Sequence, residues 1–277
     1  MLYHSQTADE GLRLPLPVAE RLPHAILCAG AKSSASTWLY NVVAEILRHR
    51  AAAEAASYAR IEGGARREGE NVRQFYADTP NEFPHYDEIA DTLVIQTQRP
   101  SSSLCALAIN ANFPIVITIR EPRDAIASLM KRFGYSFASA FRAVSIGNGP
   151  IVQLFRHGSP LVLRFEDRFY EREVTIAAVA EFLGVELTMP LLGEIFRGLT
   201  REAVSRKIET MRQSGAFGTP SNPVLHDPQT RWQLGHVGDI VIGGHAQLLS
   251  PEQQLLVLSE ATEYCSEFGY PQEPHEA

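Results

Sequence analysis

The chain has 277 residues, of which 45% are apolar and 21% are charged, and its net charge at neutral pH is −7. This composition is typical of a globular protein that can bury a sizeable core. The acidic balance excludes a general electrostatic attraction to nucleic acid or to an anionic membrane surface, so any anion-binding site must be local.

Other features of the sequence predict a cytoplasmic location. The N-terminal residues lack the apolar core of a signal peptide, and no apolar run reaches the length of a membrane span. The three cysteines, Cys28, Cys105 and Cys265, show no metal-ligand spacing and are expected to be reduced thiols. We therefore expect no nucleic acid and no membrane as partners, and we leave homodimer formation open.

The first elements in chain order are an arm, a strand and a helix. Residues 1–23 are polar with three prolines, which predicts an extended N-terminal arm, and residues 24–277 are expected to form one domain. A short buried strand is predicted at His24–Gly30. From Ser36 to about residue 50, apolar side chains recur at helical spacing, which predicts a helix capped by Ser36 or Thr37.

The remaining elements predict an α/β fold. Three more apolar strands are predicted at Asp91–Gln98, Phe113–Arg120 and residues 159–167, and they alternate with helices predicted at 101–111, 121–133, 136–146, 170–185 and 249–270. Residues 51–80 lack a long apolar stripe. Residues 51–90 and 205–235 are interpreted as two flaps, or as simple solvated surface. The fold class is therefore α/β, a single domain with a central parallel sheet flanked by helices.

The first strand–helix junction reads "CAGAKSSASTWLY", Cys28 to Tyr40. Unpaired backbone N–H groups at the start of a helix favour an anion, and Lys32 adds a full positive charge beside four hydroxyl side chains. The alternative is a capped helix preceded by an exposed lysine. The patterns G-x-x-x-x-G-K-[ST] and G-x-G-x-x-G are both absent, so the commonest nucleotide loops are excluded.

A second junction follows the third strand in "TIREPRDAIASL". Arg120 ends the strand and Ser128 lies two helical turns into the next helix, so both could hold one phosphate. The alternative is an ion pair between Arg120 and Glu121 or Asp124. Arg123 is expected to pair at the surface.

Both junctions resemble motifs of the sulfotransferase family. "AKSSASTWL" is similar to the family's 5′-phosphosulfate loop P-K-S-G-T-T-W-L, although it is one residue longer and has Ala35 in place of a glycine. Arg120 to Ser128 match the 3′-phosphate motif R-x-P-[RK]-D followed by serine. "LVLRFED … FLGV" and "GHVGDIVIGGHAQLLSPEQ" resemble two further family segments, so the resemblance covers about residues 24 to 254.

The resemblance implies a P-loop NTPase-like sulfotransferase fold and transfer of a sulfuryl group from 3′-phosphoadenosine 5′-phosphosulfate (PAPS) to a hydroxyl or amine. The product nucleotide would be adenosine 3′,5′-bisphosphate (PAP), and no metal is implied. The acceptor would be a small molecule or glycan beneath the two flaps. The implied catalytic residues are Lys32 and His85, and the implied cofactor-binding residues are Lys32, Ser33, Ser34, Ala35, Ser36, Thr37, Trp38, Arg120, Ser128, Gly235 and His236.

The chain departs from the family at the general base. Where the family has histidine in K-T-H-x-P this sequence has Gln98, which cannot accept a proton at neutral pH. His85 is the first substitute, and the other candidates are Glu82, Asp87, Glu88 and His236. The family's Arg-Lys before the glycine at position 235 is also missing, so Arg231 or His236 would have to replace it.

Two other functions stay open on the sequence. A non-catalytic nucleotide-binding relative would explain Gln98 and the missing Arg-Lys pair. A P-loop kinase or nucleotidase would hold Mg²⁺ on Glu166 or Asp167 at the end of the fourth strand.

Overall fold

The computed structural model describes residues 25–58, 85–89, 92–219, 222–223, 226–227, 229–238 and 242–273, and within these ranges only the backbone at 51–58, 85–88, 218–219 and 222–223. The predicted N-terminal arm, residues 1–23, lies outside the described residues, as does most of the first predicted flap.

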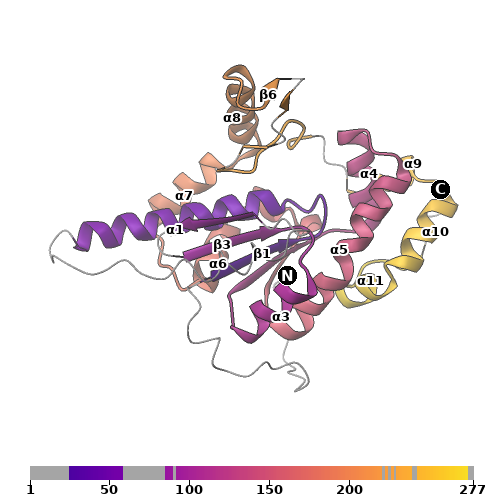
Figure 1. Cartoon of the computed structure of the whole chain (residues 1–277), viewed down its shortest axis with the longest axis horizontal. Helices are drawn as coiled ribbons and strands as arrows, with labels where there is room; N and C mark the ends of the chain where they lie inside the picture. The colour runs from indigo at the N-terminus through magenta and orange to yellow at the C-terminus, as the bar shows by residue number, and fades with distance from the viewer. Residues whose placement is uncertain are drawn as a thin grey trace.

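The centre of the described chain is a sheet with strand order β2-β3-β1-β4-β5. Its strands are β1 (Ala25–Gly30), β2 (His85–Ile89), β3 (Thr92–Thr97), β4 (Ile115–Ile119) and β5 (Leu161–Arg164). All neighbours are parallel except β2, which pairs antiparallel with β3 at the edge. The four predicted strands and the parallel sheet are thus confirmed, and β2 is an addition. Figure 1 shows this sheet between two layers of helices.

The central strands form because their side chains are apolar on both faces. Every residue of β1, β3 and β4 is buried, as expected for a parallel sheet covered by helices on both sides. The sequence of β2 is "HYDEI", whose polar residues give no such signal. This explains why the pattern of the sequence predicts the inner strands and misses the edge.

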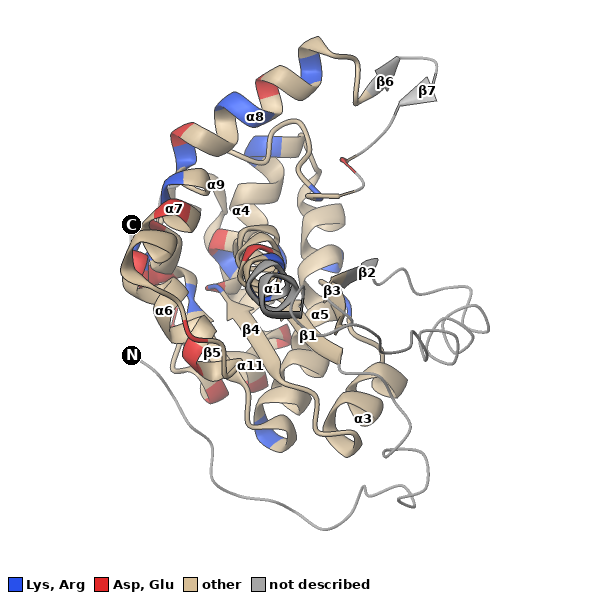
Figure 2. Ribbon diagram, turned by 90° about the vertical axis from the view of Figure 1, so that its left-hand side faces the viewer, with Lys and Arg blue, Asp and Glu red and all other residues tan. Residues whose placement is uncertain are grey.

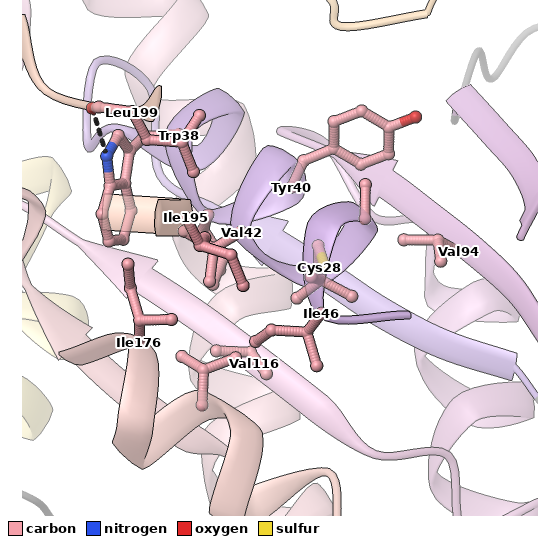
Figure 3. Packing of buried hydrophobic residues seen from close by; sticks show 14 of the residues in the cluster. Cys28, Trp38, Tyr40, Val42, Ile46, Val94, Val116, Ile176, Ile195 and Leu199 are labelled. Carbon is pink, nitrogen blue, oxygen red and sulfur yellow. Dashed lines mark hydrogen bonds between the residues drawn. The ribbon is translucent and has the colours of Figure 1, made fainter. Parts of the chain in front are cut away.

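One face of the sheet packs on α1 (Ser36–Tyr58), α6 (Glu173–Phe182), α7 (Met189–Gly198) and α8 (Arg201–Gln213). Figure 3 shows this core, in which Cys28, Val94 and Val116 of the strands meet Val42 and Ile46 of α1. Helix α1 continues beyond the predicted end near residue 50, because the following residues are mostly alanine, the strongest helix former.

The other face packs on α3 (Ser102–Asn110), α5 (Phe137–Gly158) and α11 (Thr262–Phe268). The prediction of a helix over 136–146 is too short, because α5 continues through Pro150 to Gly158, about three turns further. Proline removes one backbone hydrogen bond, yet burial of Ile151, Val152 and Leu154 outweighs that loss.

A third layer holds α4 (Pro122–Phe133), α9 (His245–Leu248) and α10 (Pro251–Glu260) beside α5. Short 3₁₀ turns at Phe165–Asp167 (η3) and Phe169–Glu171 (η4) follow β5, and β6 (Gly218–Thr219) pairs with β7 (Asn222–Pro223). The predicted helix over 249–270 is instead two helices that break at Ala261. Its start is well defined, since Ser250 and Gln253 form a reciprocal capping box.

Basic and acidic residues alternate along α8, as the colours in Figure 2 show, and these residues are exposed. The ion pair between Arg212 and Glu209 on this helix, at 2.7 Å, is typical of a solvated surface. Within the described residues no helix combines the length and the apolar character that crossing a bilayer requires.

Candidate nucleotide-binding site

A cavity of about 1070 Å³ opens at the carboxyl ends of the parallel strands. Its wall carries Lys32, Arg99, Arg132, Arg201 and Arg231 together with His226 and His236, and among the described residues its one acidic side chain is that of Glu171. The chain as a whole has a net charge of −7, so this concentration of positive charge is local. Such a cavity attracts anions despite the acidic surface around it.

The loop between β1 and α1 forms one side of this cavity. Among the described residues, no acceptor receives a hydrogen bond from the backbone N–H groups of residues 32–38. Ser33 and Ala35 have φ values of 57° and 63°, so the loop adopts the left-handed conformation twice without a glycine. Alternating conformations of this kind form nests of N–H groups that bind phosphate.

Two buried residues hold the loop in this shape. Ser34 is fully buried and donates to the carbonyl of Ala31 at 2.6 Å, and its hydroxyl also lies 2.6 Å from that of Thr118 on β4. Gly30 is needed because a Cβ there would lie 2.4 Å from the Thr118 hydroxyl. The Ser34 hydroxyl, implied above as a phosphate ligand, is therefore occupied by hydrogen bonds within the protein. Its neighbours Ser33, Ser36 and Thr37 line the cavity.

Lys32 points into the cavity and is fixed by the residue that replaces the family's histidine. Its Nζ donates to Oε1 of Gln98 at 2.6 Å, and Nε2 of Gln98 donates to the Ser36 hydroxyl at 2.9 Å. Burial, together with the charge of Arg99, lowers the pKa of Lys32 to about 8. Gln98 thus connects the loop to the end of β3 and positions the Lys32 ammonium.

Trp38 lines the cavity but belongs to the core. Its ring is 6% exposed, meets Phe169 edge-on, and donates from Nε1 to the Leu199 carbonyl at 3.0 Å, the dashed line in Figure 3. Stacking of Trp38 on an adenine stays a prediction.

Arg120 lies directly behind the same loop. Its Nη1 donates to the Ser33 carbonyl at 2.9 Å, and its guanidinium lies 4.0 Å from the centre of the Phe165 ring. Its buried Nε has no hydrogen-bond partner, so one donor remains for a ligand. The alternative ion pair with Glu121 or Asp124 is not formed.

Neither Arg120 nor Ser128 belongs to the wall of the large cavity. The structure brings Arg120 to the loop that contains Lys32, while Ser128 is half-buried on α4, one turn before Arg132. Arg132 does line the cavity, so the cavity reaches the helix that carries the predicted 3′-phosphate motif.

The prediction that Arg123 pairs at the surface is wrong. Arg123 is 1% exposed; its Nε donates to Glu121 at 2.7 Å and its Nη1 to the Glu273 carbonyl at 3.0 Å. Asp124 accepts hydrogen bonds from the backbone of Gly243 and His245 and lies 2.7 Å from Nδ1 of His245. Glu121, Asp124 and His245 form a buried cluster. A buried carboxylate needs several hydrogen-bond donors, and the C-terminal segment supplies donors to Asp124, so these contacts anchor that segment on α4.

Arg132 was not recognised in the sequence. It donates to the Gly235 carbonyl at 2.9 and 2.6 Å and also to the His236 carbonyl, so it holds the segment that lacks the family's Arg-Lys pair. Gly235 has φ +76°, and a Cβ at Gly238 would lie 3.1 Å from the Arg132 side chain. A cation at the last turn of α4 was visible in the sequence, but its partners lie about a hundred residues away and gave no local signal.

His236 lines the cavity as a neutral imidazole. Burial, together with the charges of Arg132, His226 and Lys32, lowers its pKa to about 3. Its Nδ1 accepts a hydrogen bond from the backbone of Gln233 at 3.1 Å. This pKa makes His236 a poor proton acceptor at neutral pH.

The other candidate bases are only partly described. The backbone of His85 in β2 pairs with Gln96, which lines the cavity, while the side chains of His85, Asp87 and Glu88 and all of Glu82 lie outside the described residues. Glu166, the candidate Mg²⁺ ligand, accepts from the Glu121 backbone at 2.9 Å and from Tyr270 at 3.0 Å, and neither Glu166 nor Asp167 lines the cavity.

Comparison with known proteins identifies the fold. No protein-family model matches the chain, and no curated protein sequence matches it. Mouse sulfotransferase SULT7A1 complexed with PAP superposes with a TM-score of 0.54 at 15% identity, covering 87% of this chain and 83% of that chain. The chain has the sulfotransferase fold.

A second solved structure agrees. Retinol dehydratase, in complex with androsterone and the inactive cofactor PAP, superposes with a TM-score of 0.54 at 14% identity, covering 91% of this chain and 82% of that chain. Its complex with retinol and PAP gives a TM-score of 0.52. The sulfotransferase fold predicted from the two loop motifs is therefore confirmed over most of the chain.

Proposed function

We propose that this protein is a sulfotransferase that uses PAPS and binds it in the basic cavity. The observation that carries the proposal is the loop of residues 32–38, whose backbone N–H groups have no acceptor among the described residues and face a cavity shared with Lys32. Solved structures with the same fold hold PAP, which supports a nucleotide with separate 3′- and 5′-phosphates. PAPS, when bound, supplies the sulfuryl group that is transferred.

The residues of this chain fit the two ends of that nucleotide. Lys32, the N–H groups of residues 33–37 and the hydroxyls of Ser36 and Thr37 would hold the 5′ end. Arg120, with its free Nε donor, and Ser128 would hold the 3′-phosphate, and Arg132 on the same helix adds charge there. Gly235 and His236 would close the site, since Arg132 fixes their carbonyls.

Lys32 and the start of α1 would perform the electrostatic part of catalysis. Negative charge builds on the 5′-phosphate as the sulfuryl group leaves, and a preorganised ammonium and helix N-terminus stabilise it without rearrangement. Gln98 contributes by holding the Lys32 ammonium at 2.6 Å. We assign proton removal from the acceptor to His85, with Asp87, Glu88 and Glu82 as alternatives, because Gln98 cannot accept a proton and the pKa of His236 is about 3.

A second candidate function is nucleotide binding without catalysis. It is favoured by the engagement of Gln98, whose side chain is hydrogen-bonded to both Lys32 and Ser36 where the family places a base. Both candidates require PAP to bind, and they differ in whether sulfate reaches an acceptor.

The proposal also covers the acceptor, the cellular location and the partners of the protein. We take the acceptor to be a small molecule or glycan hydroxyl or amine, since the solved relatives hold androsterone and retinol. The parts of residues 51–90 and 205–235 that lie outside α1, β2 and α8 would act as flaps over it. The second range supplies His226, Arg231 and Trp232 to the cavity wall. A cytoplasmic location, no metal requirement and no binding to nucleic acid or membrane complete the proposal.

The test combines nucleotide binding with transfer. Calorimetry of PAP and AMP with the native protein and with Ser128→Ala should show PAP weakened by about 10- to 100-fold and AMP nearly unchanged, since a hydrogen bond to a charged group contributes roughly 1.5 to 3 kcal/mol. Arg120→Gln should weaken PAP more than AMP, because Arg120 also binds the Ser33 carbonyl of the loop that holds the 5′ end. Lys131→Gln, an exposed charge on the same helix, is the matched control. Equal weakening of both nucleotides would overturn the 3′-phosphate assignment.

Transfer is then measured with radiolabelled PAPS and a panel of phenols, alcohols, sugars and amines. Sulfated product that requires Lys32 supports the enzyme. Tight PAP binding with no product from any acceptor, in the presence of intact PAPS, would favour the non-catalytic relative.

A further inference from the structure

A second, smaller cavity opens beside Lys32. It measures about 220 Å³ and is lined by Lys32, Arg99 and Arg142 together with the hydroxyl side chains of Tyr135 and Ser139. Lys32, Arg99, Leu129 and Tyr135 line the large cavity as well, so the two cavities adjoin. Arg142 lines only the smaller one.

Arg99 and Arg142, two exposed side chains of this side cavity, have no counter-charge within the part of the chain that the structure describes. Among the described residues, no hydrogen-bond acceptor or carboxylate engages the guanidinium of Arg99 or of Arg142. No acidic side chain lines the cavity within the described part of the chain. Arg99 lies close enough to Lys32 to lower its pKa, so like charges are held together here.

Many other arginines of this acidic chain do have an acceptor. Some pair with carboxylates, as in Arg48–Glu45 at 2.7 Å and Arg156–Glu263 at 2.6 Å, and others donate to backbone carbonyls, as Arg132 does to Gly235 at 2.6 Å. Arg142 lies on the same helix as Arg156, and that helix offers it no acid. The side cavity therefore concentrates positive charge that a bound anion would neutralise.

The remaining donors suit an oxyanion. Ser136 donates to the Ser139 hydroxyl at 3.0 Å, which leaves the Ser139 O–H group as a donor, and the Tyr135 hydroxyl has no partner among the described residues. Guanidinium groups with hydroxyl donors match the planar or tetrahedral oxygens of carboxylate, sulfate and phosphate. At about 30 Å³ for each water, 220 Å³ has room for one such group with several waters.

We propose that the side cavity of Arg99, Arg142, Tyr135 and Ser139 binds an oxyanion carried by the acceptor, so that this protein selects acceptors with a carboxylate, sulfate or phosphate group. The inference rests on the proposed function, which assigns the donor nucleotide to the loop of residues 32–38, Arg120 and Ser128. That assignment gives no role to Arg99 or Arg142, and their cavity adjoins the large one at Lys32.

The experiment uses the native protein saturated with PAP, so that the donor site is filled. Sodium sulfate is titrated by calorimetry at constant ionic strength maintained with sodium chloride. Binding is expected in the native complex, and Arg142→Gln and Arg99→Gln should each weaken it by about 10- to 100-fold, while Lys131→Gln, a matched exposed charge outside both cavities, leaves it unchanged. A PAP complex that does not bind sulfate overturns the proposal.

Acceptor-like probes identify the source of the anion. 4-Hydroxyphenylacetate, 4-hydroxyphenyl phosphate and neutral 4-hydroxyphenylacetamide are titrated into the same complexes, and one of the two anions should bind at least about tenfold more tightly than the amide, with that preference lost in Arg142→Gln. The anionic probe that binds more tightly shows whether carboxylate or phosphate is the preferred group. Equal binding of all three, or an unchanged preference in Arg142→Gln, overturns the proposal.

Two further outcomes separate this inference from its premise. If Arg142→Gln weakens PAPS and leaves sulfate and both anionic probes unaffected, the side cavity serves the donor and the inference is wrong. If the native protein does not bind PAP at all, the proposed function fails, and the inference that rests on it fails with it.

Discussion

Lys32 should give this protein a pH-dependent affinity for PAP. Burial and the charge of Arg99 lower its pKa to about 8, so the free protein loses this cation between pH 7 and pH 9. A phosphate placed beside Lys32 favours the charged form and raises the pKa in the complex. Affinity is therefore highest below pH 8 and falls as the pH rises above it.

The size of the effect follows from the fraction of Lys32 that is charged in the free protein. That fraction is about nine tenths at pH 7 and about one tenth at pH 9 if the pKa is about 8, so PAP should bind roughly tenfold more weakly at pH 9, a change of about 1.4 kcal/mol. Above pH 7 the ligand contributes little, because phosphate monoesters have a second pKa of about 6. His236 does not titrate in this range, since its pKa is about 3.

The assay is calorimetry of PAP binding between pH 7 and pH 9 in two buffers of different ionisation enthalpy, which also counts protons taken up on binding. Uptake of about half a proton is expected near pH 8. Lys32→Arg is the matched control, because arginine stays charged throughout and should bind PAP with neither pH dependence nor proton uptake. A flat profile in the native protein, or the same decline in Lys32→Arg, would refute the position assigned to Lys32.

Three further predictions concern residues that support the site. Each is tested by measuring the free energy of unfolding in urea. Gly30→Ala should lower it by about 1 to 3 kcal/mol, since the new methyl would lie 2.4 Å from the Thr118 hydroxyl. Ala35→Gly should raise it by up to about 1 kcal/mol because φ is 63° there, whereas Ala106→Gly inside α3 should lower it by about 1 kcal/mol; equal signs would contradict the loop geometry. Burial raises the pKa of Asp124, but its hydrogen bonds with His245 and Gly243 outweigh burial and lower the pKa overall. Its contribution to stability is therefore present above pH 4 and declines as the solution becomes more acidic, and Asp124→Asn should flatten that decline.

The inner sheet was predictable because its physical cause is local. Runs of mostly apolar residues in β1, β3 and β4 are typical of strands buried on both faces, and the helices between them carry apolar residues at helical spacing. The edge strand β2 has a polar sequence whose pairing depends on its neighbour β3. The continuation of α5 through Pro150 likewise depends on packing against the sheet, which no local pattern shows.

The site residues that belong to a sequence motif could be predicted. Those whose position depends on a partner far away in the sequence could not. The loop with Lys32 and the strand-end Arg120 were found from the sequence, and the structure brings them together through the Ser33 carbonyl. The role of Gln98 as a clamp between Lys32 and Ser36 and the contact of Arg132 with Gly235 link segments 62 to 103 residues apart. The burial of Arg123 was missed for the same reason, since the Glu273 carbonyl that it binds lies at the far end of the chain.

The central claim is that one nucleotide with two separate phosphates binds between the loop of residues 32–38 and the start of α4. A crystal structure of the protein with PAP tests it most directly. The account predicts the 5′-phosphate within hydrogen-bond distance of the loop N–H groups and Lys32, and the 3′-phosphate within reach of Arg120 or Ser128. A PAP molecule bound elsewhere, or with its 5′-phosphate away from this loop, would contradict it.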